Sequence, residues 1–115
     1  MQITERQVGD VAIIDLNGRL VLGEGDDLVR DKVNSLVQQE RKNILLNLSQ
    51  LSYMDSAGLG ALVSCYTTVT RRGGSLKLLG LTKRVSDLLA ITKLLTVFDS
   101  YDTEKDAIAS FHVRV

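Results

Sequence analysis

Hydrophobic positions in the first third of the chain change from the spacing of strands to that of a helix. Two segments rich in β-forming residues are separated by Gly9-Asp10, which predicts a tight antiparallel hairpin. The second strand is expected to continue past a bulge at Asn17-Gly18. Valines and leucines then recur at helical intervals with charges between them. The predicted elements are strands at 2–8 and 11–16, a continuation at 20–22 and a helix at 24–40.

The rest of the chain alternates short apolar runs with amphipathic segments. ILLNL and LKLLG are nearly continuous apolar runs, as in strands covered on both faces of a parallel sheet. Helical spacing follows each of them. Thr82 is predicted to cap the helix that follows it, and the last helix is expected to open with Thr103–Asp106, which resembles a capping box. The predicted elements are strands at 44–48 and 76–80, helices at 57–72 and 83–92, a short strand after 94–98, and a final helix through Phe111.

The order β-β-α-β-α-β-α-β-α predicts an α/β fold in one domain spanning residues 1–115. Strands that alternate with helices imply right-handed crossovers and a mostly parallel sheet, to which the hairpin adds an antiparallel edge. In such sheets the functional site lies beyond the carboxyl ends of the strands, where helices begin. The predicted loop at 49–57 occupies that position.

Composition and charge exclude several classes of function. The 14 basic and 14 acidic residues are interspersed, whereas nucleic-acid binding needs a basic patch. Arg71-Arg72 is explained as the end of a helix, where cations are favourable. The single cysteine, Cys65, excludes an internal disulfide and fits a reducing compartment. No apolar run approaches the roughly 20 residues needed to cross a bilayer. The polar segment MQITERQVGD lacks the basic and then apolar layout of a signal peptide, so the expected location is the cytoplasm.

The segment LSYMDSAGLG (51–60) carries the candidate site. Either Asp55 or Ser56 caps the next helix by accepting a hydrogen bond from its first turn, which leaves the other residue free. Gly58 and Gly60 each disfavour a helix by roughly 1 kcal/mol relative to alanine. Two such residues in one turn indicate that another backbone, or a partner protein, approaches closely.

Two long stretches of the sequence, MDSAGLGALV and RRGGSLKLLGLTKRVSDLLAITKLLTVFDSYDTEKDAIASF, resemble a STAS domain of the anti-sigma factor antagonist family. The most specific piece is D-S-x-G-L-G after an apolar strand, and the resemblance extends over essentially the whole chain. It implies that the unmodified protein binds an anti-sigma factor, which is itself a serine kinase, and thereby frees the sigma factor. It also implies that the kinase ends this binding by phosphorylating Ser56, and that a metal-dependent serine phosphatase restores it.

The surface expected to contact the partner surrounds Ser56. A phosphate there would add about −1.5 to −2 charges, which the helix N-terminus tolerates but which a partner interface would have to desolvate. Tyr53 and Met54 are candidate anchors, with the alternative that one of them points into the core. The predicted contact residues are Ser52, Tyr53, Met54, Asp55, Ser56, Ala57, Gly58, Leu59 and Gly60.

Other functions fit the residues less well. A serine hydrolase needs glycine two positions before the nucleophile, where Met54 stands, and a dinucleotide site needs a third glycine where Val63 stands. One Cys, one His and scattered carboxylates predict no metal site, so neither a cofactor nor an enzymatic activity is expected. The alternative within the family is a STAS scaffold of a signalling complex or a subunit of a phospholipid-transport ABC system. The oligomeric state is open, since edge strands can pair.

Overall fold

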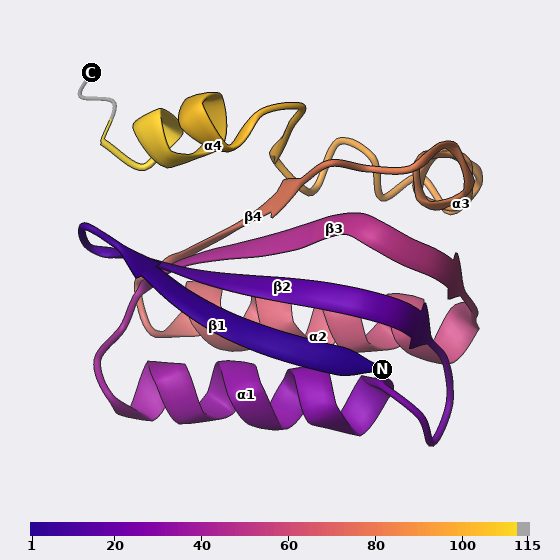
Figure 1. The fold of residues 1–115 in the computed structure, drawn as a ribbon, viewed down its shortest axis with the longest axis horizontal. Helices are drawn as coiled ribbons and strands as arrows, with labels where there is room; N and C mark the ends of the chain where they lie inside the picture. The colour runs from indigo at the N-terminus through magenta and orange to yellow at the C-terminus, as the bar shows by residue number, and fades with distance from the viewer. Residues whose placement is uncertain (113–115) are drawn as a thin grey trace.

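The computed structural model describes residues 1–112, and its elements follow the predicted order (Figure 1). Most boundaries lie within two residues of the predicted ones. The elements are β1 (Gln2–Val8), β2 (Val11–Leu20), α1 (Asp26–Gln38), β3 (Asn43–Met54), α2 (Ser56–Arg71), β4 (Ser75–Leu79), α3 (Lys83–Ile91), β5 (Ser100–Tyr101) and α4 (Glu104–Ser110).

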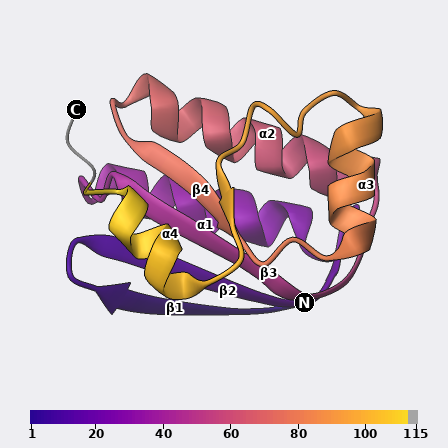
Figure 2. The same cartoon turned by 90° about the horizontal axis from the view of Figure 1, so that it is seen from above.

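The five strands form one sheet in the order β1-β2-β3-β4-β5. β1 pairs antiparallel with β2 through the predicted hairpin, and all the other pairings are parallel. The predicted mixed α/β sheet is therefore confirmed. Because β2, β3 and β4 run in the same direction, their carboxyl ends share one edge of the sheet, and α3 lies at that end of the molecule (Figures 1 and 2).

The strand β3 is the largest departure from the predicted boundaries. The sequence predicts a strand that ends at residue 48 and a loop after it, but β3 continues to Met54. It does so because β2 is also long and pairs with it as far as Leu20, through register shifts between Asp15 and Asn17 and between Gly18 and Arg19. These bulges interrupt the two-residue period that marks a strand, which is why this part of β3 resembles a loop in the sequence.

Helices cover the two faces of the sheet unequally (Figure 1). On one face α1 and α2 pack on a large core that contains fully buried side chains such as Leu46 and Leu62. On the other face α4 covers a smaller cluster, centred on Ile13, Leu45 and Ala107. The buried apolar surface on the first face therefore supplies most of the stability.

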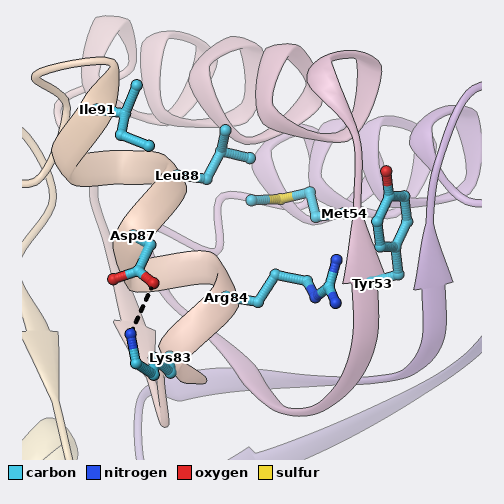
Figure 3. A pocket seen from close by; sticks show the side chains of 7 residues that line it. All are labelled: Tyr53, Met54, Lys83, Arg84, Asp87, Leu88 and Ile91. Atoms are coloured by element: carbon cyan, nitrogen blue, oxygen red, sulfur yellow. Dashed lines mark hydrogen bonds and ion pairs between the residues drawn. The ribbon is translucent and has the colours of Figure 1, made fainter.

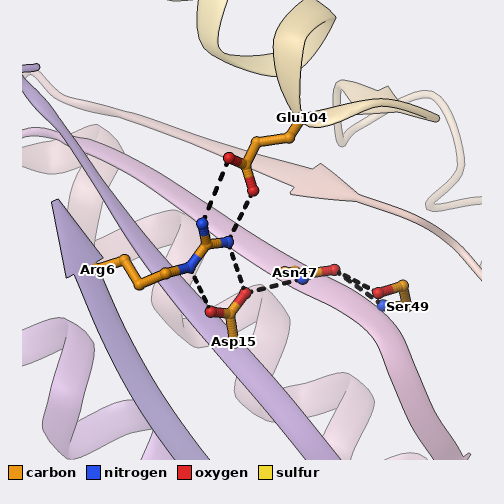
Figure 4. Close-up of polar contacts among 5 residues, drawn as sticks. All are labelled: Arg6, Asp15, Asn47, Ser49 and Glu104. Atoms are coloured by element: carbon orange, nitrogen blue, oxygen red, sulfur yellow. Dashed lines mark hydrogen bonds and ion pairs between the residues drawn. The ribbon is translucent and has the colours of Figure 1, made fainter. Parts of the chain in front are cut away.

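An ion-pair network fastens α4 to the hairpin (Figure 4). The Arg6 guanidinium donates to Asp15 through Nε at 2.6 Å and to Glu104 through Nη2 at 2.7 Å. Asn47 Nδ2 donates to the same Asp15 carboxylate at 2.8 Å. These contacts lower the pKa of Asp15, with Arg6 as the main cause. Arg6 therefore links β1, β2 and α4.

The predicted helix caps are present. The side chain of Thr82 accepts a hydrogen bond from the Val85 amide at the start of α3, and Thr103 accepts one from Asp106 at the start of α4. Arg71 lies in the last turn of α2, as the sequence predicts for a helix C-terminus. Among the described residues no helix is both long enough and apolar enough to cross a membrane.

Candidate functional site

The helix α2 begins directly after the carboxyl end of β3, and Asp55 is its cap. Asp55 has an extended backbone, and its Oδ1 accepts a hydrogen bond from the Gly58 amide at 2.9 Å. Of the two candidate caps, the structure thus selects Asp55, and the interpretation of Ser56 as the cap is wrong. Ser56 is the first helical residue and is exposed, and its hydroxyl makes no hydrogen bond within residues 1–112.

Asp55 also joins α2 to the loop that follows β2. Its Oδ2 accepts from the Leu22 amide at 3.2 Å, and its own amide donates to the Leu20 carbonyl at 3.3 Å. The backbone hydrogen bonds, that from Gly58 above all, hold the pKa of Asp55 below its usual value, since they favour the charged carboxylate. The sequence identifies Asp55 as a cap candidate but does not reveal this second contact.

The two glycines of the first turn have different surroundings. A Cβ on Gly58 would lie 2.1 Å from the carbonyl oxygen of Leu20, so the close approach of another backbone is confirmed there. A Cβ on Gly60 would meet nothing within 4 Å. The packing of this chain therefore explains why residue 58 is a glycine, but it gives no reason for a glycine at position 60.

The predicted contact residues divide into an outward and an inward group. Of the two candidate anchors, Met54 is only 3% exposed and belongs to the core, whereas Tyr53 is 38% exposed; the alternative that one of them points inward is correct for Met54. Ser52 is exposed, and its hydroxyl donates to the Gly18 carbonyl at 3.1 Å. The exposed group is Ser52, Tyr53, Ser56 and Gly60, the partly exposed residues are Asp55 and Ala57, and the buried group is Met54, Gly58 and Leu59.

A shallow groove lies between the end of β3 and α3 (Figure 3). Its volume is about 460 Å³, and we call it the α3 groove. The guanidinium carbon of Arg84 lies 5.0 Å from the centre of the Tyr53 ring. The sequence analysis missed the residues of α3 that line this groove. The shared direction of β3 and β4 does indicate that the helices after them start at the same edge of the sheet. The groove is lined by Tyr53, Met54, Lys83, Arg84, Asp87, Leu88 and Ile91.

Comparison with known proteins identifies the family. The model of the STAS domain matches residues 2–107. The chain is 32% identical over 108 residues to the anti-sigma-B factor antagonist of Listeria monocytogenes, with 90% of each chain covered. The chain belongs to the STAS-domain proteins of the anti-sigma factor antagonist family. The predicted family is thereby confirmed, and its members are regulators rather than enzymes.

Solved structures of related proteins have the same fold. A candidate anti-sigma factor antagonist from Thermotoga maritima superimposes with a TM-score of 0.90 at 26% identity, and the match covers 96% of this chain and 95% of that one. The Bacillus protein SpoIIAA, solved in unphosphorylated and phosphorylated forms, matches with a TM-score of 0.76 at 22% identity. Those matches cover 98% and 95% of this chain, and 100% and 98% of SpoIIAA.

Cys65 and His112 are the two remaining side chains of reactive types, and neither lies at the candidate site. Cys65 is buried, and burial raises the pKa of its thiol to about 12, so it is protonated at neutral pH and a poor nucleophile. His112 lies beside Asp10 at the hairpin, far along the sheet from Ser56, with 2.5 Å between Nε2 and Oδ1. Within residues 1–112 no cluster of three His, Cys, Asp or Glu side chains has the arrangement of a metal site.

Proposed function

We propose that this chain is an anti-sigma factor antagonist whose binding to an anti-sigma serine kinase ends when Ser56 is phosphorylated. One observation carries the proposal: Asp55 caps α2, so the fold does not need the exposed Ser56 hydroxyl as a hydrogen-bond acceptor. A kinase can therefore reach Ser56 without unfolding the helix. In the transfer, Ser56 Oγ forms a bond to the γ-phosphorus of ATP, ADP leaves, and the hydroxyl proton passes to a base of the kinase.

The position of Ser56 accounts for an effect on binding rather than on folding. The amide groups and the dipole of a helix N-terminus stabilise a phosphate, whereas the neighbouring Asp55 carboxylate repels it. These effects oppose each other, so we expect the fold to change little. An interface that covers Ser56 would have to desolvate about two additional negative charges. The phosphorylated form of SpoIIAA, a protein with this fold, is consistent with a fold that persists after modification.

The proposal includes the cellular setting that the family implies. The antagonist acts in the cytoplasm, where the kinase and ATP are present, and a serine phosphatase removes the phosphate from Ser56. The exposed position of Ser56 serves this reverse step as well, since a phosphatase needs the same access.

Phosphorylation is tested by intact-mass measurement after incubation with a candidate anti-sigma serine kinase and ATP. We expect wild type to gain one phosphate and Ser56→Ala to gain none. Ser64→Ala is the matched control, because Ser64 is exposed on the same helix, and it should gain one phosphate as wild type does. A phosphate on Ser56→Ala would contradict the assignment of the acceptor.

Binding is tested by calorimetry with the same kinase. Ser56→Asp should weaken the complex about tenfold or more, because it places a charge in the interface. Equal affinity of Ser56→Asp and wild type would contradict the switch. Absence of both binding and phosphorylation would favour a scaffold or a transporter subunit.

A further inference from the structure

The α3 groove has unpaired positive charge. Of its three charged lining residues, Lys83 and Asp87 form an ion pair with 3.0 Å between Nζ and Oδ2. Arg84 makes no ion pair with any residue in 1–112, and the same holds for Arg19 on β2. The groove and its border therefore present two guanidinium groups that a partner can engage.

Tyr53 positions both arginines. The guanidinium carbons of Arg84 and Arg19 lie over its ring, 5.0 Å and 5.7 Å from the centre. Such cation–π contacts are favourable even at exposed sites. They restrict two long side chains to the end of β3, so less side-chain entropy is lost when a partner carboxylate binds.

The groove also offers apolar surface beside these charges. Met54 forms a buried part of its wall, Leu88 is partly exposed, and Ile91 is 78% exposed. A single exposed isoleucine is ordinary on a protein surface. Here it lines the same groove as the unpaired Arg84, about two turns away on α3, a combination that complements an acidic and apolar segment.

We propose that the α3 groove binds an acidic amphipathic segment of the anti-sigma factor, with carboxylates on Arg84 and Arg19 and apolar side chains on Leu88 and Ile91. The inference rests on the proposed function. The groove is continuous with the surface around Ser56, because Tyr53 and Met54 line it and immediately precede Asp55 and Ser56. Two free cations are too few for strong binding of nucleic acid.

The test compares Arg84→Glu with Arg71→Glu. Arg71 is an exposed arginine at the far end of α2, roughly 22 Å from Ser56 along a helix of 1.5 Å rise per residue. The partner is the anti-sigma serine kinase that phosphorylates Ser56, and the measurements are its affinity and the KM and kcat of phosphorylation. Arg84→Glu should weaken binding and raise KM about tenfold with kcat unchanged, because it removes docking but leaves Ser56 intact. Arg71→Glu should match wild type.

A second variant tests the apolar half of the groove. Ile91→Ser should weaken the complex by a smaller factor, about fivefold, and should fold as wild type does because the side chain is exposed. Circular dichroism of each variant checks its folding.

The outcomes separate this inference from the proposed function. If Ser56 is phosphorylated but Arg84→Glu and Ile91→Ser bind as tightly as Arg71→Glu, the groove proposal is overturned and the switch stands. If wild type neither binds nor is phosphorylated, both are overturned. If sedimentation shows a dimer of this chain that Arg84→Glu dissociates, the occupant is a second copy, and the proposed partner segment is wrong.

Discussion

Gly58 and Gly60 stand two residues apart in the first turns of α2 and meet opposite surroundings. Gly58 faces the Leu20 carbonyl so closely that a methyl group does not fit, whereas Gly60 faces open space. Both disfavour the helix equally by their backbone entropy. One short motif therefore serves two purposes. Its inward residues pack α2 closely against the sheet, and its outward residues make no contact that the fold needs.

The same division applies to Asp55 and Ser56. Asp55 holds the helix start and the loop after β2 through hydrogen bonds to the Gly58 and Leu22 amides. Ser56 is exposed, and its hydroxyl has no hydrogen-bond partner in residues 1–112. Chemistry on the outward side can therefore change charge at the surface while the packing of α2 remains. Stability and partner binding should respond to different members of the motif.

The largest expected effect is that of Gly58→Ala. The added Cβ would overlap the Leu20 carbonyl oxygen, and a backbone group cannot move aside without shifting β2 or α2. We expect a loss of about 3 kcal/mol of unfolding free energy, at the upper end of typical overpacking. Urea unfolding followed by circular dichroism measures it.

Gly60→Ala is the matched control for that substitution. Because its Cβ meets nothing within 4 Å, we expect a gain of about 0.5–1 kcal/mol from improved helix propensity. Equal destabilisation by the two variants would refute the division into inward and outward residues. If the lack of a side chain at Gly60 allows a partner to approach closely, Gly60→Ala should weaken kinase binding while it stabilises the chain.

The sequence predicted the fold well because each element carries its own local signal. Apolar runs, helical spacing and the capping threonines Thr82 and Thr103 each identify an element without knowledge of its neighbours. The end of β3 has no such signal. Its pairing with β2 depends on bulges in β3 itself, and only the assembled sheet shows that Leu51 and Met54 face the core while Tyr53 faces outward.

The sequence predicted the part of the candidate site that is contiguous in the chain, but not the contacts that this part makes with residues distant in the sequence. The motif around Ser56 is contiguous in the sequence, and its helix-start chemistry limits the cap to Asp55 or Ser56. Choosing between them required the hydrogen bond from the Gly58 amide to Asp55, and the second contact of Asp55 is with Leu22, which is 33 residues away. Arg84 and Ile91 were missed for the same reason, since they reach Tyr53 and Met54 only through the packing of α3 beside β3.

A smaller effect should separate Asp55→Ala from Ser56→Ala. Removal of the cap leaves the Gly58 and Leu22 amides without their acceptor, so Asp55→Ala should lower the melting temperature by several degrees. Ser56→Ala should change stability by less than about 0.5 kcal/mol. Thermal unfolding of both variants is the measurement. A larger loss in Ser56→Ala would mean that Ser56 supports the helix after all.

The smallest effect is the pH dependence of the Asp55 cap. The pKa of Asp55 is lowered in the folded state, so its carboxylate stabilises the fold above the unfolded pKa of about 3.9 and loses that contribution as pH falls through the folded pKa. Asp55→Asn keeps an acceptor for the helix amide but does not titrate. The difference in unfolding free energy between wild type and Asp55→Asn should therefore be constant near neutral pH and shift against wild type below about pH 4. Asp10 and Asp15 also have lowered pKa values, but both proteins contain them, so their contributions cancel. A difference that stays flat down to pH 2 would show that the hydrogen bonds to Asp55 do not depend on its charge.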